Sequence, residues 1–251
     1  MEILDCFCGI GPWARRDRLL PYRPEEIVTL MDHFGVAQAL VHSNLAANGG
    51  WVPEANQILS DMVKGQPRFL PAFTLAPLPH DNGSKADYFA AEMRACGARA
   101  AWLWPQGHGM GGGLWSWLIG DLLAMCSERR IPVLMHAEDR NPNDIETMLS
   151  EFPRLRLILA GLSYGSDKWL FPLLRRHEGL HVCLGHYYIP PGGPLPFLRH
   201  FTTERLIFGS GLPKFSPGGL IAHVMYAPIG DDAKETILGG NLRRLLSEAR
   251  P

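Results

Sequence analysis

Eight short apolar segments, separated by longer stretches that are mostly amphipathic, constrain the fold of this chain more than any other feature. The segments are Ile3 to Phe7, Ala37 to Val41, Leu70 to Leu75, Ala98 to Leu103, Val133 to Met135, Leu155 to Leu159, His181 to Leu184 and Leu206 to Phe208. Alternation of strands and helices is typical of a parallel sheet, because parallel strands need a crossover connection. Eight such units in 251 residues predict one domain over residues 1–251, a single (β/α)8 TIM barrel of the α/β class.

Helix signals lie between these segments. The Pro24 to Phe34 stretch begins with proline and two acids, a pattern that favours a helix start. Proline is tolerated there because the first helical N–H has no partner within the helix, and acidic side chains interact favourably with the positive end of the helix dipole. Asn143-Asp144 predicts another helix start. The Lys234 to Leu246 stretch has apolar spacing near 3.6 and predicts a terminal helix that Gly239-Gly240 interrupts.

Charge and composition narrow the function classes. The formal net charge is -1 and no long basic run occurs, so binding to nucleic acid or to an acidic membrane surface is not expected. No apolar run approaches the roughly 18 residues of a membrane helix. The chain opens without the regions of a secretory signal, and five cysteines, an odd number, do not predict a disulfide framework. We therefore expect a cytoplasmic protein.

Several segments, taken in order, resemble the amidohydrolase-related superfamily. They include Pro67 to Phe73, Ile131 to His136, Arg205 to Pro213 and Ile237 to Leu246, which are similar to the third, fifth and eighth barrel strands and to the terminal helix of that family. The resemblance covers the whole chain and supports the same barrel fold. It implies a hydrolase or decarboxylase-type enzyme that acts on a small organic substrate, carboxylated or cyclic, with a divalent metal.

The metal ligands that the resemblance implies are mostly absent. The family places two histidines on the first strand, one after the fifth strand, often one after the sixth and an aspartate after the eighth. Here Phe7 and Gly9 replace the first pair, the sixth strand ends in Leu159-Ala160-Gly161 where a histidine is expected, and the eighth supplies Gly211. His136 alone matches. A metal that activates water needs several nitrogen and oxygen ligands. We therefore predict that the metal site is largely lost and that no cofactor is bound, with zinc as the alternative.

His136 is the centre of the predicted catalytic group. Glu138 and Asp139 follow it closely, and this is the densest titratable cluster expected at the carboxyl ends of the strands. A histidine exchanges protons near neutral pH, and a neighbouring carboxylate can orient it. The alternative is a barrel histidine that serves as a hydrogen-bonded core residue.

Cys6 and Cys8 lie two residues apart on the first strand, so strand alternation places both thiols on one face. If Phe7 and Gly9 face the barrel interior, both thiols face the surrounding helices and act as small buried hydrophobes. Two alternatives stay open. The pair could bind a soft metal together with His136, or one thiol could be a nucleophile that His136 activates.

Polar and aromatic residues that follow the strands predict a substrate pocket, because active sites of such barrels lie at this face. They are His42, Trp104, Ser163, Tyr164, His186, Tyr187 and Lys214. Lys214 and the histidines would supply charge for a small organic acid, and Trp104 a flat apolar wall. Such residues also occur on the surface loops of any barrel.

Tryptophans gather around the fourth strand. Trp102, Trp104, Trp115 and Trp117 indicate an apolar patch, and the sequence leaves open whether it faces substrate, core or another subunit.

Two functions therefore remain open. The protein is either an amidohydrolase-like enzyme with metal-free chemistry around His136, or a non-catalytic binding module or structural partner of an active homologue, a pseudoenzyme. The expected partner is a small-molecule substrate or ligand. A homo-oligomer, or a hetero-oligomer with a related barrel protein, fits the second function.

Overall fold

A computed structural model describes residues 1–13, 20–47, 49, 51–78, 85–105, 113–137 and 141–251, and the backbone but not the side chain of Tyr164. In this part of the chain eight strands form one sheet in chain order, and each pairs in parallel with the next. The strands are β1 (Ile3–Ile10), β2 (Val36–Ser43), β3 (Phe69–Leu75), β4 (Ala100–Leu103), β5 (Val133–His136), β6 (Leu157–Ala160), β7 (Leu180–Leu184) and β8 (Leu206–Phe208). The predicted (β/α)8 barrel is confirmed.

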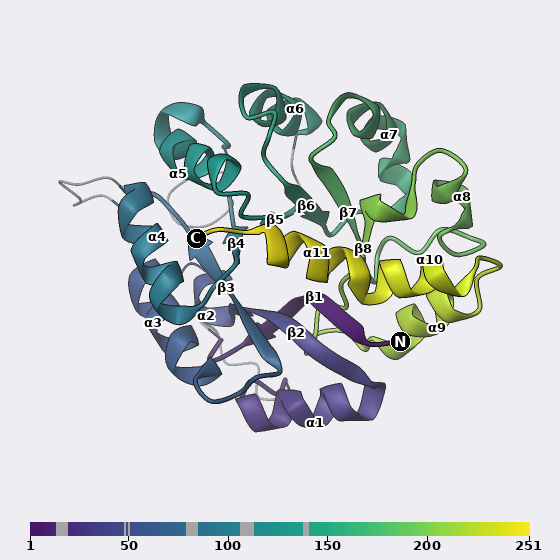
Figure 1. Cartoon of the computed structure of the whole chain (residues 1–251), viewed down its shortest axis with the longest axis horizontal. Helices are drawn as coiled ribbons and strands as arrows, with labels where there is room; N and C mark the ends of the chain where they lie inside the picture. Colours follow the sequence, from purple (N-terminus) through teal and green to yellow (C-terminus); the bar gives the residue numbers. More distant parts are fainter. Residues whose placement is uncertain (14–19, 48, 50, 79–84, 106–112, 138–140) are drawn as a thin grey trace.

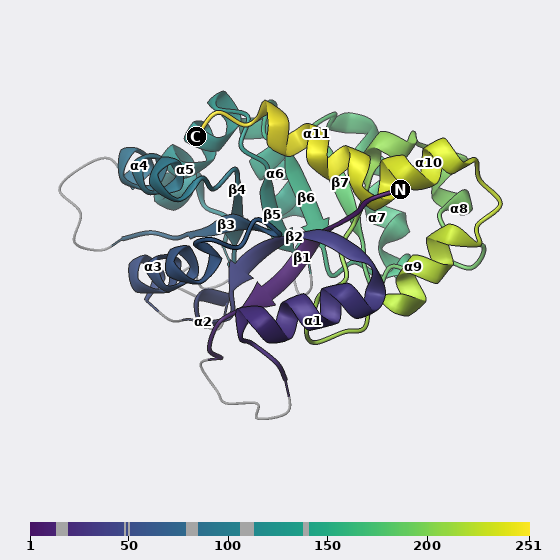
Figure 2. The same cartoon turned by 60° about the horizontal axis from the view of Figure 1, so that its bottom comes forward.

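Helices surround the strands, as Figure 1 and Figure 2 show. They are α1 (Pro24–Phe34), α2 (Asn44–Ala47), α3 (Val52–Val63), α4 (Lys85–Cys96), α5 (Ser116–Glu128), α6 (Pro142–Glu151), α7 (Asp167–Arg176), α8 (Leu195–Leu198), α9 (Gly218–Met225), α10 (Asp231–Glu235) and α11 (Asn241–Glu248). Short 3-10 turns η1 (Tyr164–Ser166) and η2 (Thr203–Arg205) and a π-helical turn η3 (Thr236–Gly240) complete the described elements.

The helix predictions were right in outline. The helix predicted to begin at Pro24 has the observed bounds of α1. The helix expected to begin at Asn143-Asp144 begins earlier, because the Asn141 side chain accepts a hydrogen bond from the Asn143 amide at 3.0 Å and Pro142 takes the first helical position. The expected interruption at Gly239-Gly240 is the π-helical turn between α10 and α11.

Strand β1 meets the segment after β8 and so closes the barrel. The Gly9 amide donates to the Leu212 carbonyl at 2.8 Å, and the Gly211 amide donates to the Phe7 carbonyl at 2.8 Å. These bonds continue the parallel pattern past the end of β8. Because they fix the backbone on both sides, they set where Phe7 and Gly211 lie at the barrel mouth.

The buried Asp5 carboxylate supports this closure. One of its oxygens accepts hydrogen bonds from the amides of Phe7 and Ser210, both at 2.9 Å, and the other accepts from the Ser210 hydroxyl. Burial raises the pKa of Asp5 from 3.8 to about 6, although the three hydrogen bonds favour the charged form and oppose this shift. The side chain thus links β1 to the segment after β8, and it accepts hydrogen bonds from donors that would otherwise be buried without a partner.

The apolar core has two layers. The inner layer fills the barrel and consists of Leu4, Cys6, Leu40, Ala72, Ala100, Trp102, Leu134, Ile158, Ala160, Cys183 and Ile207, together with Leu242, Leu245 and Leu246 of α11. Figure 1 shows α11 lying across the barrel, and its leucines close the end where the strands begin. Three of the inner positions are alanines, which leaves room for the fully buried Trp102.

A β-bulge in β1 changes the expected side-chain alternation. Asp5 pairs with Ala39 and Cys8 pairs with Val41, so three residue steps on β1 face two on β2. Cys6 consequently belongs to the inner layer, whereas Cys8 belongs to the outer layer against the helices. The prediction that both thiols face outward was therefore right for Cys8 and wrong for Cys6.

The separation of the two thiols weighs against both alternatives proposed for them. Cys6 Sγ lies 3.6 Å from Cys183 Sγ in the barrel interior, while Cys8 packs outside it, so the Cys-x-Cys pair cannot chelate one ion. Burial raises the pKa of both Cys6 and Cys8, so both stay protonated at neutral pH. They act as small hydrophobes.

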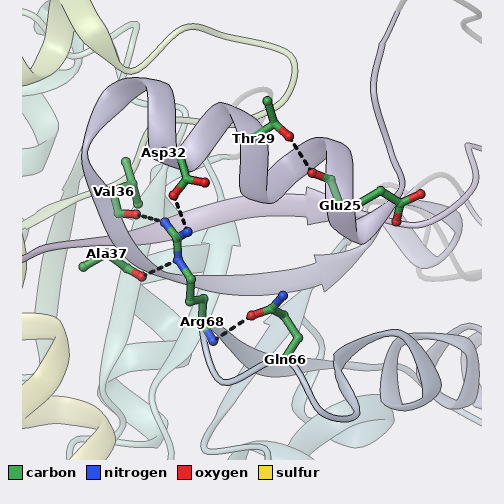
Figure 3. Close-up of polar contacts among 7 residues, drawn as sticks. All are labelled: Glu25, Thr29, Asp32, Val36, Ala37, Gln66 and Arg68. Carbon is green, nitrogen blue, oxygen red and sulfur yellow. Dashed lines mark hydrogen bonds and ion pairs between the residues drawn. The ribbon is translucent and has the colours of Figure 1, made fainter.

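Arg68 joins α1, β2 and β3 at the end of the barrel opposite the mouth (Figure 3). Its guanidinium donates to the Val36 carbonyl at 2.7 Å and to the Ala37 carbonyl at 3.1 Å, and it pairs with Asp32 of α1. The carbonyls at the beginning of β2 are thereby satisfied by a fixed planar donor. This contact helps to hold the first two strand–helix units in register.

We predict that Asp5→Ala destabilises the fold by about 3 kcal/mol, because it leaves buried donors of Phe7 and Ser210 without an acceptor. Urea unfolding measures the loss. The control is Asp231→Ala, which removes an exposed carboxylate whose one ion pair among the described residues is with Lys234, and it should change stability by less than about 0.5 kcal/mol. Equal stability of Asp5→Ala and the unsubstituted protein would contradict this account of barrel closure.

Candidate functional site

Four aromatic side chains gather at the carboxyl ends of β1, β2 and β4. The ring of Phe7 lies 4.9 Å from that of Trp102 and 5.5 Å from that of His42, measured between centroids. His42 in turn lies 5.0 Å from Trp102 and 5.2 Å from Trp104. The two indoles stack at 4.6 Å with an interplanar angle of 7°. We call these four residues the aromatic cluster.

His42 is held neutral by its surroundings. Its side chain is buried, and burial lowers its pKa from 6.5 to about 3, with a smaller contribution from the positive charge of His136. Neutral imidazole is therefore the form of His42 at physiological pH. A proton-transfer role at neutral pH does not suit a group with so low a pKa.

Polar atoms in and beside the aromatic cluster lack hydrogen bonds. Within the described residues no partner lies near His42 Nδ1, Trp102 Nε1, Trp104 Nε1 or the hydroxyl of Thr74, and all four atoms are buried. Thr74, the penultimate residue of β3, pairs in register with Trp102 of the cluster, and its amide donates to the Asn56 side chain at 3.0 Å. Buried polar atoms in native proteins usually have partners, so this group could bind a ligand or ordered water.

His136 ends β5 and is partly exposed. Its ring meets the ring of Phe7 edge-on at 6.0 Å. Its positive charge, when protonated, lowers the pKa of both His42 and His186, so it lies within electrostatic range of both groups of site residues. Glu138 and Asp139, predicted as its carboxylate neighbours, lie outside the described residues.

A second group lies after β7 and β8. The His186 ring stacks on Phe215 at 3.3 Å and lies 3.8 Å from the ring of Tyr187, and Lys214 Nζ lies 5.2 Å from the Phe215 centroid. Burial, with smaller contributions from the charges of His136 and Lys214, lowers the pKa of His186 from 6.5 to about 4. Lys214 and Tyr187 are exposed, so this group offers a positive charge to solvent.

Three glycines at the mouth leave space that other side chains fill. A Cβ on Gly9 would lie 2.1 Å from Asn44 Oδ1, one on Gly161 2.1 Å from His136 Cε1, and one on Gly211 2.9 Å from Phe215 Cδ2. These are three of the positions at which the resemblance places metal ligands, and a fourth is Phe7. Among the residues that the structure describes, no group of three or more His, Cys, Asp or Glu side chains could hold a metal ion.

The predicted pocket residues fall into separate sets. His42 and Trp104 contact each other, as do His186 and Tyr187, with Lys214 nearby. The remaining two predicted residues are Ser163 and Tyr164. Ser163 is exposed and makes only local bonds to Ser166, and Tyr164 begins η1 while its side chain lies outside the described residues.

Sequence reasoning missed three residues of the site. Asn44 follows β2, fills the space at Gly9 and donates to the Gly11 carbonyl at 3.0 Å. Thr74 and Phe215 were also missed. Asn44 and Thr74 share a signal, a polar residue at the end of a strand, which could have found them. Phe215 carries no such signal, because only its contact with His186 shows its place.

The four tryptophans around β4 do not form one patch. Trp102 is buried inside the barrel and Trp104 stacks on it, whereas Trp115 and Trp117 stack on each other at 5.4 Å on the surface. Trp115 is 45% exposed and Trp117 77%. The patch that the sequence indicated therefore divides into a core pair and a surface pair.

The family model for amidohydrolases matches residues 15–247. The chain belongs to the amidohydrolase family. No curated protein matches it in sequence. No helix in the described segments has the length and apolar character needed to cross a membrane.

Similar solved structures share the fold of this member of the amidohydrolase family. An uncharacterised TIM-barrel protein from Bordetella bronchiseptica has 22% identity and a TM-score of 0.75, with 99% of each chain covered. A 2,6-dihydroxybenzoate decarboxylase from Rhizobium has 14% identity and a TM-score of 0.72, with 98% of each chain covered. A dihydroxybenzoic acid decarboxylase from Polaromonas sp. JS666, with bound manganese and the inhibitor 2-nitroresorcinol, has 12% identity and a TM-score of 0.71, covering 98% of this chain and 97% of that one.

We predict that the protein loses stability as the pH falls from about 6.5 toward 3, partly because of His42. Its pKa is lowered in the folded state, so the unfolded chain binds the proton first and acid favours unfolding. His181 and His186, with pKa values of about 4, act in the same direction. The raised pKa of Asp5, about 6, acts in the opposite direction between pH 6 and 3.8.

His42→Phe keeps a ring in the aromatic cluster and removes the titration. The unfolding free energy of this variant should therefore fall less steeply below pH 6.5 than that of the unsubstituted protein. The two slopes should differ by up to about 1.4 kcal/mol per pH unit. Urea unfolding at several pH values between 7.5 and 4.5 measures the slopes. Exposed His33→Gln is the control, and a slope for His42→Phe equal to that of the control would refute the buried neutral state.

Proposed function

We propose that this amidohydrolase acts on a small carboxylated or cyclic compound at the barrel mouth, as a hydrolase or decarboxylase, through His136 and without a resident metal ion. Its family and the decarboxylases among its structural neighbours support the reaction class. One observation carries the metal-free part. The positions that the resemblance assigns to ligands hold Phe7, Gly9, Gly161 and Gly211, and the space beside the glycines is filled.

The residues at the mouth do not fit a divalent ion in the family arrangement. A histidine at position 9 or 161 would overlap Asn44 or His136, and an aspartate at 211 would press on Phe215. Phe7 offers no donor atom. One histidine at the remaining position cannot fix a coordination geometry, since structural and catalytic sites use at least three protein ligands.

His136 is the group proposed to move a proton. The pKa values of His42 and His186 are lowered to about 3 and 4, so these imidazoles stay neutral at pH 7 and His136 is the remaining described histidine of the mouth. In a decarboxylation the bond between the substrate carbon and its carboxylate breaks, carbon dioxide leaves, and His136 delivers a proton to the carbon that keeps the electron pair. Water then returns the proton to His136. In a hydrolysis neutral His136 instead accepts a proton from the attacking water.

The two groups of site residues suit an aromatic or cyclic acid. The Trp104 indole, stacked on the fully buried Trp102, gives a flat apolar surface, and its Nε1, which has no partner among the described residues, can donate to a substrate oxygen. Lys214, in the group after β7 and β8, supplies an exposed positive charge for a carboxylate. The neighbours that act on dihydroxybenzoates lead us to propose hydroxylated benzoates as the first compounds to assay.

A non-catalytic binding module is the second candidate. The filled ligand positions favour it as much as they favour metal-free catalysis, since a barrel that only binds has no need of a metal. Its partner could be another copy of this chain or a related barrel, with the exposed Trp115, Trp117 and Tyr226 available for contact. Turnover by the purified protein separates the two candidates.

We predict that turnover of hydroxylated benzoates is unchanged by a chelator and falls at least about 100-fold in His136→Gln, because general acid–base catalysis typically contributes 10²–10⁴. Product formation is followed by chromatography, and metal content by elemental analysis. His200→Gln, at the opposite end of the barrel, is the matched control and should retain activity. About one tightly held metal per chain, with activity lost on chelation, would overturn the metal-free mechanism; binding without turnover would favour the module.

A second prediction concerns Gly161→Ala. The added Cβ would lie 2.1 Å from the His136 ring, so the imidazole must move and activity should fall at least about tenfold. The control is Gly97→Ala, because Gly97 has a similar positive φ, 75° against 70°, with nothing within 4 Å of the added atom. Both variants should lose about 1 kcal/mol of stability from the backbone, measured by urea unfolding. Equal activities of the two variants would show that the position of His136 does not matter.

A further inference from the structure

A cavity lies at the end of the barrel opposite the candidate site. It has a volume of about 690 Å³ and lies beside the beginnings of β6, β7 and β8, next to α11. The charged residues in its lining are Arg154, Arg156, Glu178, Glu204, Arg205 and Arg244. Four arginines against two glutamates give the wall an excess of positive charge in a protein whose formal net charge is -1.

Neighbouring carboxylates do not remove this excess. Glu248 pairs with both Arg156 and Arg244, but it also pairs with Arg130 outside the cavity wall. Adding Glu248 and Arg130 to the wall therefore leaves the excess unchanged. One glutamate is shared by three guanidinium groups, each of which could hold a carboxylate or phosphate of its own.

Two of the arginines have unused donors. Among the described residues Arg154 has no ion pair or side-chain hydrogen bond, and its side chain is exposed. Arg156 is mostly buried, with 12% of its side chain exposed, and its Nη1 has no hydrogen-bond partner in the described part of the chain. A buried guanidinium nitrogen without a partner is costly, and an anion would satisfy it.

The pKa of His181, on β7, responds to the positive charge of the cavity wall. This histidine lines the wall, is 5% exposed, and its Nδ1 lies 3.0 Å from the Gly179 carbonyl. Burial, with smaller contributions from the charges of Arg205, Arg244 and Arg156, lowers its pKa from 6.5 to about 4. The charges of Glu178 and Glu204, also in the wall, favour the protonated form of Arg205 and partly oppose the lowering of its pKa by burial.

We propose that this cavity binds a small multivalent oxyanion, with phosphate or carboxylate groups held by Arg154, Arg156 and Arg244. Its volume is that of a small-molecule site, and four arginines provide the planar, paired donors that such groups accept. The site is independent of the barrel mouth, because its wall comes from the opposite ends of the strands.

Binding of pyrophosphate and of citrate, measured by calorimetry at constant ionic strength, tests the proposal and separates phosphate from carboxylate recognition. We expect saturable 1:1 binding of at least one of the two. Arg154→Gln should weaken it at least about tenfold, as loss of a charge-assisted contact predicts. Arg94→Gln on α4, which removes the same charge from an exposed position elsewhere, should leave affinity unchanged. Lys214→Gln at the mouth should also leave it unchanged.

The titration of His181, followed by NMR, gives a readout inside the cavity. A bound anion offsets the field of the arginines, so the pKa of His181 should rise on saturation, and Arg154→Gln should require more ligand for the same rise. No saturable binding of either compound, equal weakening by Arg94→Gln, or an unchanged His181 titration would each overturn the proposal.

Discussion

The closure of the barrel by Asp5 and Ser210 is the contact on which the arrangement of the mouth depends. The carboxylate accepts the amides of Phe7 and Ser210, so it fixes both strands that meet at the seam. The β-bulge of β1 begins at the same residue, and it carries Cys6 and Phe7 to the barrel side while Cys8 stays outside. A single buried acid therefore organises the seam and the first wall of the candidate site.

The mouth that results is filled by side chains where the family resemblance places metal ligands. Asn44, His136 and Phe215 occupy the space beside three glycines, and Phe7 packs against Trp102. Within this wall His42 is kept neutral by burial, and several ring nitrogens are left without partners in the described residues. An apolar wall of rings with few fixed donors suits the flat organic acid that we propose as substrate better than a hydrated ion.

Much of the fold follows from the sequence because its signals are local. Each of the eight apolar segments specifies one strand, and the proline and acids that begin at Pro24 specify the start of one helix. The structure confirms these elements. The orientation of Cys6 could not be predicted, since a bulge is set by pairing with β2 and breaks the alternation of side chains. Phe215 was missed for a similar reason, because its place depends on a contact with His186 from another strand. Glycines in place of ligands were visible in sequence, but the side chains that fill their space were not.

Anomalous diffraction from crystals soaked in manganese or zinc tests the central claim most directly, because it locates a metal independently of activity. The account predicts no ordered metal within coordination distance of His136 or His42, with Asn44 and Phe215 in the positions described. A fully occupied metal peak coordinated by His136 and by other protein groups at the mouth would contradict it.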